Sequence, residues 1–179
     1  MYKYVALFRG LNVGGHNKIT MVDLKAMLEG ADCQKVTTYI QSGNAVFQSD
    51  VSPNEIESHL ENAFEDQFGY AVEIMVRGDK ELQAVFDDYP FFNEERELRF
   101  MMTGFAKGGF APDAETVLAN VAEGDELVQI VGNQVHFYFA NGSGRSKLGA
   151  LNFAKKIGTP LTLRNRRTVG KLLELINAL

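Results

Sequence analysis

The segment Val36–Gln48, VTTYIQSGNAVFQ, places two runs of strand-forming residues on either side of Gly43 and Asn44. Glycine and asparagine tolerate the positive φ angles that a tight turn requires, so this pattern predicts a β-hairpin. The segment Leu127–Phe139, LVQIVGNQVHFYF, repeats the arrangement around a second Gly-Asn pair. Two hairpins of one kind in a chain of 179 residues indicate that a structural unit has been duplicated.

The residues around each hairpin predict a strand and a helix before it and a helix and a strand after it. Around the first hairpin we expect a strand at Tyr4–Phe8, a helix capped by Thr20, a helix capped by Ser52 with Glu55 and ended by Gly69, a strand at Val72–Val76, and a further helix from about Asp79 to Asp88. Around the second we expect a strand at Leu98–Met102, a helix opened by Pro112 and Asp113, a helix at Ser146–Ile157 ended by Gly158, a strand at Leu161–Leu163, and a last helix capped by Thr168.

Two glycine landmarks repeat at one spacing, because Gly132 follows Gly43 and Gly158 follows Gly69 by the same 89 residues. The predicted fold class is therefore α+β: a tandem duplication of two ferredoxin-like βαββαβ units, each with an antiparallel sheet and an extra helix. We expect the units to span 1–90 and 91–179. Because units below roughly 100 residues have marginal cores, we also expect the halves to unfold together as one two-lobed module.

Basic residues are concentrated at the two ends of the chain. The last 38 residues, Gly142–Leu179, contain eight bases and one acid, and the first 22 contain three bases and no acid, although the net charge is −5. Such segregation makes a local positive potential that selects anionic partners. The acidic pI of 5.2 argues against broad binding of duplex nucleic acid.

Composition excludes several other classes. The only cysteine, Cys33, cannot form an internal disulfide, which favours a reducing compartment. The amino terminus lacks a long apolar segment before Arg9, and no stretch reaches membrane length. We therefore expect a cytoplasmic protein with no membrane partner.

Residue patterns for metal or nucleophilic chemistry are weak. The histidines, His16, His59 and His136, lack metal-ligand spacing, and no serine occupies a nucleophile elbow. We expect no cofactor, no metal site and no identifiable catalytic residue.

The first candidate binding stretch is Phe8–Lys18, FRGLNVGGHNK, which follows a strand and precedes a helix. Helix amino termini attract anions, and glycines let backbone N–H groups approach them. The candidate ligand residues are Arg9, Asn12, Gly14, Gly15 and Lys18. Turn formation alone is the alternative explanation of this composition.

The second candidate stretch is Thr162–Lys171, TLRNRRTVGK. Arginine recognises phosphate or carboxylate with two parallel hydrogen bonds, so we expect a solvent-facing clamp here. Its residues are Arg164, Asn165, Arg166 and Arg167. A solvated charged face is the alternative.

The third candidate is the turn of the first hairpin, where Ser42 and Asn44, with Gln41 and Tyr39 nearby, offer hydrogen-bonding groups. The alternative is that the hairpin itself requires this sequence.

The three stretches, FRGLNVGGHNKI with Met21 and Leu24, TTYIQSGNAVF, and LRNRRTV with Lys171 and Leu172, resemble the bacterial family catalogued as domain of unknown function 1697 (DUF1697). The resemblance extends over essentially the whole chain and implies two tandem ferredoxin-like units. It implies no activity or cofactor. It marks as signature positions Arg9, Asn12, Gly14, Gly15, Lys18, Tyr39, Ser42, Gly43, Asn44, Arg164, Asn165 and Thr168. The sequence departs from the family pattern at Arg166, where an aromatic residue is common.

The function that these observations favour is binding of an anionic small molecule, a nucleotide or a short RNA between the two basic ends. Two rivals remain: an enzyme acting on an anionic small molecule, with His16 as acid or base, and a protein-interaction scaffold. The oligomeric state is left open.

Overall fold

A computed structural model describes residues 1–14 and 18–179. Its contacts divide the chain into two compact units, the first formed by Met1–Gln83 with Lys171–Leu179 and the second by Ala84–Gly170. The last nine residues therefore belong with the first unit, and the division falls earlier than the expected one after residue 90. Two helices cross these divisions: α3 (Asp79–Asp87) and α6 (Arg166–Asn177).

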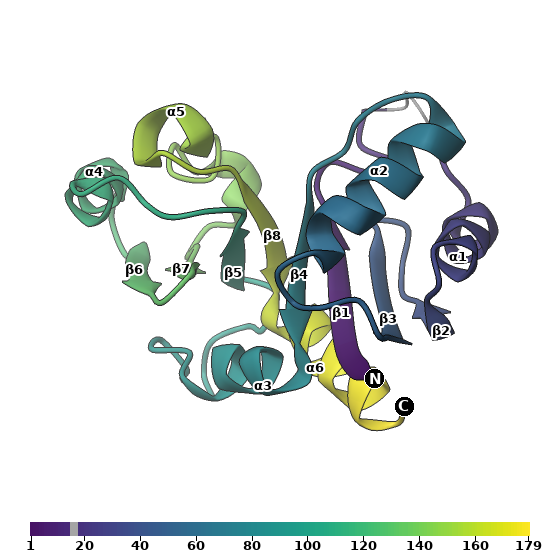
Figure 1. Cartoon of the computed structure of the whole chain (residues 1–179). Coiled ribbons are helices and arrows are strands. Elements are labelled where there is room, and N and C mark those ends of the chain that lie inside the picture. Colours follow the sequence, from purple (N-terminus) through teal and green to yellow (C-terminus); the bar gives the residue numbers. More distant parts are fainter. Residues whose placement is uncertain (15–17) are drawn as a thin grey trace. The chain divides into compact units, whose positions relative to one another are not determined.

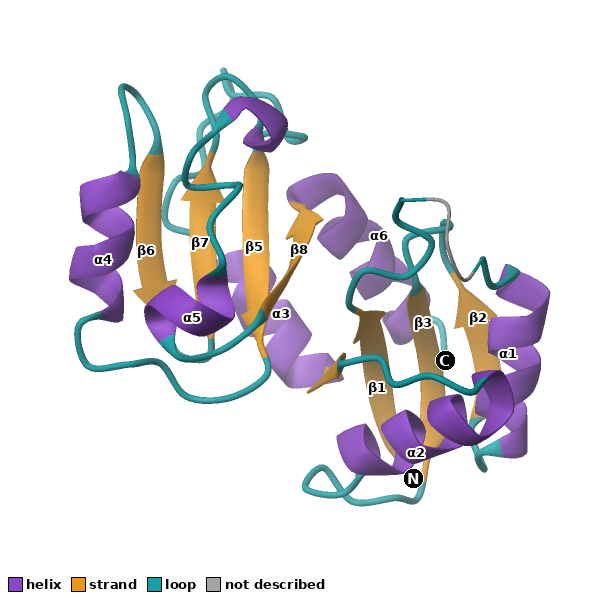
Figure 2. Cartoon of the chain, turned by 90° about the horizontal axis from the view of Figure 1, so that it is seen from above, coloured by secondary structure: helices purple, strands orange, loops and turns teal. Residues whose placement is uncertain are grey.

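The first unit has the βαββαβ order, with β1 (Tyr2–Phe8), α1 (Met21–Gly30), β2 (Gln34–Thr38), β3 (Asn44–Ser49), α2 (Ile56–Phe68) and β4 (Ile74–Gly78). The strands form one antiparallel sheet in the order β2-β3-β1-β4. Helices α1 and α2 lie on one face of it (Figures 1 and 2). The core between helices and sheet includes Phe8, Phe47 and Phe64, each fully buried.

The second unit repeats this plan with β5 (Met101–Ala106), α4 (Ala114–Val121), β6 (Leu127–Val131), β7 (Gln134–Tyr138), the short 3₁₀ helix η1 (Ser143–Arg145), α5 (Phe153–Ile157) and β8 (Leu161–Asn165). Its antiparallel order is β6-β7-β5-β8. The predicted tandem of two α+β units is confirmed. All four glycine landmarks have the positive φ angles expected of turns and helix ends.

Helix starts follow the predicted capping chemistry only in part. The Thr20 hydroxyl accepts the N–H of Asp23 and caps α1, as predicted. Ser52 does not directly precede α2: its hydroxyl donates to the Glu55 carboxylate in a turn that leads into the helix. The last helix begins at Arg166, so Thr168 lies inside α6 and the prediction that it caps the helix is wrong.

The predictions for the second unit were wrong in two other places. Strand β5 begins at Met101, so Thr103 and Gly104 lie within the strand and not at its end. The helix predicted for Ser146–Ile157 is limited to Phe153–Ile157. Residues 147–150 form a turn instead, in which the Ser146 hydroxyl accepts the Gly149 N–H. Gly149 lies so close to the Ser143 carbonyl oxygen that a Cβ there would overlap it, so this turn requires glycine.

Both faces of the first sheet are buried. The face away from α1 and α2 carries four side chains with 0% exposure: Val5, Leu7, Val46 and Met75. Ferredoxin-like proteins that bind RNA stack bases on aromatic side chains of an open sheet face. The first sheet presents no such open face, because Val5, Leu7, Val46 and Met75 are buried.

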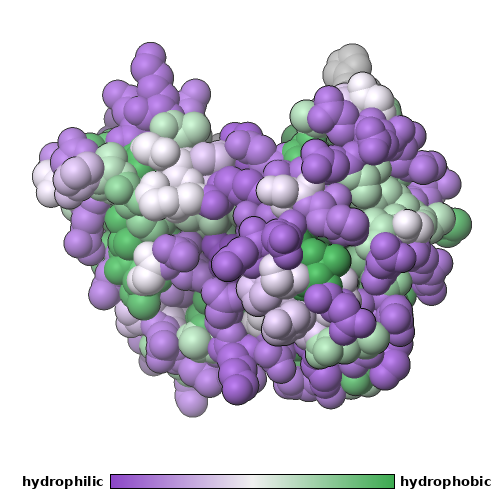
Figure 3. Space-filling view, viewed as in Figure 1, coloured by the Kyte–Doolittle hydropathy of each residue, from purple (hydrophilic) through white to green (hydrophobic). Residues whose placement is uncertain are grey.

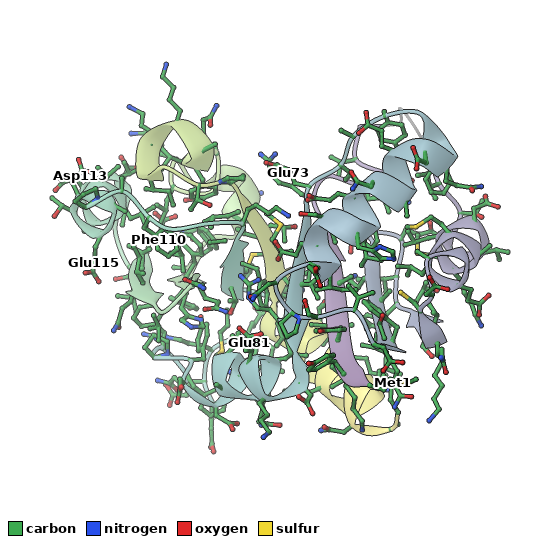
Figure 4. The ribbon with its side chains drawn as sticks, in the orientation of Figure 1. Met1, Glu73, Glu81, Phe110, Asp113 and Glu115 are labelled. Atoms are coloured by element: carbon green, nitrogen blue, oxygen red, sulfur yellow. The ribbon has the colours of Figure 1, made fainter. Side chains whose placement is uncertain are left out.

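Carboxylate side chains cover the β4 edge of the first sheet. In β4, the backbone N–H groups of Ile74, Val76 and Gly78 donate hydrogen bonds to the carboxylates of Glu61, Glu57 and Glu81, respectively. Glu57 and Glu61 lie on α2, and Glu81 lies at the start of α3 (Figure 4). These hydrogen bonds satisfy the backbone donors that β1 does not reach.

No helix in the described part of the chain is long and apolar enough to cross a membrane.

Candidate functional site

The loop after β1 is fastened by the side chain of Asn12, which has a φ of +59°. Its Oδ1 accepts the N–H of Ile19 at 2.8 Å, and its Nδ2 donates to the carbonyl oxygens of Ile19 and Gln41, each at 2.9 Å. Both donor hydrogens and the amide oxygen are thus used within the protein. Asn12 was predicted to orient a ligand, but the structure shows it joining the loop, the residues before α1 and the hairpin turn.

The hairpin turn is fastened in a similar way by Asn44, which is completely buried. Its side-chain Nδ2 donates to the Tyr39 carbonyl oxygen at 2.9 Å and to Ser42 Oγ at 3.2 Å. Its main-chain carbonyl oxygen accepts the Tyr39 N–H at 2.8 Å. Burial excludes direct contact between the Asn44 side chain and a ligand in this conformation. Its role is to fix the shape of the turn.

Gly43 brings the turn against the loop after β1. Its carbonyl accepts the Phe8 N–H at 3.0 Å, and a Cβ at this position would lie 2.8 Å from both Phe8 Cβ and Leu11 Cδ2. Gly43 therefore holds the turn in direct contact with Phe8 and Leu11.

A pocket of about 380 Å³ opens beside the hydrogen bonds of Asn12, at the start of α1. It is lined by Asn12, Lys18, Ile19, Thr20 and Gln41. The Lys18 side chain is exposed, and it forms no ion pair with a described residue. Residues 15–17 are Gly, His and Asn, so none of them carries a carboxylate that could compensate its charge. Gly15 and His16, both predicted to act at this site, lie outside the described residues.

A second pocket, of about 300 Å³, lies on the Arg9 side of the same loop and is lined by residues 9–13 and 70–73. The Arg9 guanidinium pairs there with the carboxylate of Glu73, the residue before β4 (Figure 4). The charge of Arg9 is thus partly compensated by an internal acid. Glu73 was missed at the sequence level because its proximity follows from the pairing of β1 with β4.

The second basic stretch lies at the end of β8, in the second unit. Arg164 is only 7% exposed, and its Nη1 donates to Thr162 Oγ1 at 2.8 Å and to the Leu163 carbonyl at 2.9 Å. Burial lowers the pKa of the guanidinium to about 10, which still leaves it charged near neutral pH. The prediction that Arg164 faces solvent is wrong, because β8 extends through Asn165 and holds it within the sheet.

The neighbours of Arg164 have different environments. Asn165 Oδ1 accepts the Thr168 N–H at 2.9 Å and so stabilises the first turn of α6. Arg167 is exposed, as expected for a residue of a solvent-facing cluster. The only described basic residues of the three candidate stretches that are both exposed and without an internal acid are therefore Lys18 and Arg167.

Exposed basic residues also gather over α5 and the loop before it, and in Figure 3 hydrophilic side chains lie over α5 at the top of the second unit. They are Arg145, Lys147, Lys155 and Lys156. Lys147 is paired with Glu123, which follows α4. This part of the carboxy-terminal charge is a solvated surface.

No group of three or more histidine, cysteine or carboxylate residues among those described is arranged to hold a metal ion. Cys33 is buried, and burial raises the pKa of its thiol to about 12, so the reactive thiolate is not formed near neutral pH.

Comparison with known proteins identifies the family of the chain. Residues 1–136 match the family described as "Protein of unknown function (DUF1697)". The chain belongs to this family. A solved structure, that of the conserved bacterial protein SP0830 from Streptococcus pneumoniae, is similar with a TM-score of 0.76 and 25% sequence identity over 98% of both chains. No curated protein matches the chain.

The departure from the DUF1697 pattern at Arg166 is explained by its surroundings in the second unit. Its guanidinium carbon lies 3.9 Å from the ring centroid of Phe86, 4.8 Å from that of Phe92 and 5.3 Å from that of Tyr89. Its Nη1 also donates to the Phe86 carbonyl at 2.8 Å. Arginine stacks well on aromatic faces, so in this DUF1697 protein Arg166 packs against rings of its own unit.

A buried polar row crosses the second sheet beside Arg166. His136 on β7 and Arg164 on β8 both lie opposite Thr103 on β5, and His136 Nδ1 is 3.0 Å from Thr103 Oγ1. Burial, with a smaller contribution from the positive charge of Arg166, lowers the pKa of His136 to about 4. The imidazole is therefore neutral in the folded protein near neutral pH.

This low pKa predicts acid sensitivity of the DUF1697 fold. The unfolded chain takes up the His136 proton below pH 6.5, whereas the folded chain does not until about pH 4. Stability is therefore lost as the pH falls, by roughly 2 kcal/mol between pH 7.5 and pH 5. Chemical denaturation of the wild type and of His136→Gln at each pH measures it: the wild type should lose that much more stability than the variant. Parallel losses in the two proteins would contradict the prediction.

Proposed function

We propose that this DUF1697 protein binds a small anionic ligand, of the phosphorylated or nucleotide type, in the pocket beside Lys18. The observation that carries the proposal is an exposed lysine, without an ion pair to a described residue, on a pocket in which Asn12 joins Ile19 to Gln41 by hydrogen bonds. A pre-formed pocket loses little conformational entropy when it binds. Lysine is a common phosphate-binding group because it concentrates a full charge with three N–H donors.

The start of α1 supplies further attraction. The first N–H groups of a helix have no partner within the helix, and they carry a partial positive charge. Asp23 opposes this effect, since its carboxylate lies in the first turn of α1 and accepts a hydrogen bond from the Thr20 hydroxyl. The site therefore suits a ligand whose charge lies nearer to Lys18 than to Asp23.

Size favours a small molecule over nucleic acid. A volume of about 380 Å³ falls in the range of small-ligand pockets. The sheet face on which ferredoxin-like proteins hold RNA is buried in the first unit. Binding of RNA is accordingly the weaker form of the proposal.

Thermal unfolding of the full chain with inorganic phosphate, AMP and phenyl phosphate tests the proposal. A ligand present at ten times its Kd stabilises the folded state by about 1.4 kcal/mol, which raises the Tm of a chain of this size by a few degrees. Lys18→Ala should abolish the rise. Lys25→Ala is the matched control, because Lys25 is an exposed lysine of α1 that already pairs with Glu29.

Two results would contradict the proposal. One is a wild type whose Tm is unchanged by all three anions at millimolar concentration. The other is an equal rise in the wild type and in Lys18→Ala, which would place the anion elsewhere. A rise produced equally by chloride at the same ionic strength would indicate general screening and would count against a site.

A further inference from the structure

The duplication gives the two sheets equivalent outer strands, β4 in the first unit and β8 in the second. Each lies at the end of its sheet order, next to β1 or β5 (Figure 2). In β4, Nη1 of the buried Arg77 donates to the Val76 carbonyl oxygen at 2.8 Å. In β8, Nη1 of the buried Arg164 donates to the Leu163 carbonyl oxygen at 2.9 Å. Val76 and Leu163 are therefore equivalent positions.

The pairing of β8 with β5 shows which backbone groups of β8 point away from the sheet. The Lys107 N–H donates to the Pro160 carbonyl oxygen, just before β8 begins. Antiparallel strands exchange hydrogen bonds at every second residue, so Thr162 and Arg164 are the residues of β8 that bond to β5. The N–H of Leu163 consequently points outward.

The edge that carboxylates cover in the first unit is open in the second. In the first unit Glu57, Glu61 and Glu81 accept the outward N–H groups of β4. Residues 127–173, which include α5, β8 and the start of α6, contain no aspartate or glutamate. Among the described residues, no side chain accepts the N–H of Leu163, which is partly exposed. An edge strand with unpaired backbone groups can take up a further strand.

Charge determines which strand fits this edge. Residues 127–173 contain eight basic residues, and no strand of the second sheet contains an acid. Arg167, two residues beyond the end of β8, is exposed and forms no ion pair with a described residue. A second copy of the chain that paired through its own β8 would bring like charges together. An extended segment that carries carboxylates would bring opposite charges together.

We infer that β8 is a docking strand for an extended acidic segment of a partner protein, which lengthens the second sheet by one strand. Main-chain hydrogen bonds at Leu163 contribute affinity, as they do in other proteins that bind peptides by strand addition. Arg167 contributes selectivity for carboxylates. The surface belongs to the second unit, so the inference does not depend on the anion pocket beside Lys18.

A fluorescent hexapeptide that alternates glutamate and valine is the probe, and anisotropy titration with the full chain measures its affinity. We expect a Kd of roughly 10–100 µM, because a short peptide buries little area. The same peptide with lysine in place of glutamate should bind at least about tenfold more weakly. N-methylation of all residues of the acidic peptide, which removes the N–H donors on both of its edges, should cause a similar loss of about tenfold.

Leu163→Pro tests the docking strand itself. Proline lacks the N–H and is tolerated at an edge position whose N–H faces solvent, so we expect the variant to fold. Its affinity for the acidic peptide should fall at least about tenfold, since the hydrogen bond at this position is lost. Leu163→Ala, which shortens the side chain and keeps the N–H, is the matched control and should bind within about twofold of the wild type. Arg167→Glu should weaken the acidic peptide and strengthen the lysine peptide.

Val76→Pro, at the equivalent position of β4, tests whether the two edges differ. It removes an N–H that the Glu57 carboxylate already accepts, so it breaks an existing hydrogen bond. The Tm of Val76→Pro should therefore fall several degrees further than that of Leu163→Pro. Equal falls would mean that the Leu163 N–H is already bonded in the folded protein, and they would overturn the inference.

The peptide titrations have equally definite outcomes. Binding that is lost in Leu163→Pro and on N-methylation, but kept in Leu163→Ala, supports the inference. No binding of the acidic peptide at millimolar concentration overturns it, as does equal binding of the acidic and lysine peptides. Sedimentation velocity that shows a dimer dissociated by Leu163→Pro would assign the edge to a second copy and overturn it too. If Leu163→Pro does not fold, unchanged affinity both on N-methylation and in Arg167→Glu overturns the inference.

Discussion

Replacement of Gly43 by alanine should lower the free energy of unfolding by about 3 kcal/mol or more. Gly43 has a φ of +78°, and its added Cβ would lie 2.8 Å from Phe8 Cβ. Phe8 Cβ cannot rotate away, since it is attached directly to the backbone of β1, a central strand of the sheet. Either the turn or the strand must move, and the hydrogen bond from Asn12 to Gln41 that shapes the pocket is lost. Urea denaturation followed by circular dichroism measures the loss.

Gly69→Ala is the matched control. Gly69 ends α2 with nearly the same φ, +79°, but its added Cβ meets nothing within 4 Å. This variant has the backbone strain without the overlap and should lose only about 1 kcal/mol. If the two variants lose equal amounts, close approach of the turn to β1 is not what requires glycine at position 43.

Replacement of Arg164 by alanine should cost about 3 kcal/mol, because it leaves a cavity in the second sheet and removes the partner of buried oxygen atoms. Those atoms are Thr162 Oγ1 and the Leu163 carbonyl oxygen. Chemical denaturation reports the loss. Arg167→Ala, three positions later in the chain and exposed, should stay within about 0.5 kcal/mol of the wild type.

Anion titrations of the same two proteins complete this test. If Arg164→Ala keeps its stability and loses anion binding, Arg164 is a ligand group and the structural role assigned to it is wrong. The expected result is the reverse: reduced stability, with binding at the Lys18 pocket retained under conditions where the variant is folded.

The duplication could be predicted because its signals are short-range. The Gly-Asn turns and the glycines that end α2 and α5 act through the φ of one residue, which sequence reveals directly. The apolar stripe of α2 also follows from spacing alone: Ile56, Leu60 and Phe64 are all buried.

The elements that sequence placed wrongly depend on close approach between distant residues. Gly104 resembles a strand end, but it lies inside β5, where a Cβ would come 3.0 Å from Leu161 and 3.1 Å from Phe137. Neighbours in β8 and β7 leave room only for glycine at position 104, and the sequence alone does not show which residues these neighbours are. Gly149 likewise reflects a close approach, in its case to the Ser143 carbonyl oxygen.

At the candidate site, the sequence drew attention to polar residues but did not reveal their hydrogen-bond partners. Asn12, Asn44 and Asn165 all bond to the protein's own backbone. An asparagine that binds a ligand and one that fastens a turn have the same signature in sequence, since both supply the same donors and acceptor. The positive φ of Ile40, +50° in the turn of the first hairpin, gave no signal in the sequence, because only the structure provides the φ angles of that turn.

The three carboxylates along β4 have a consequence for assembly. A second chain could extend the sheet at β4 only by forming hydrogen bonds to the N–H groups that Glu57, Glu61 and Glu81 already occupy. Strand addition, domain swapping or fibril growth through β4 must therefore first displace three side-chain acceptors. The fold thereby keeps this edge strand from recruiting other copies.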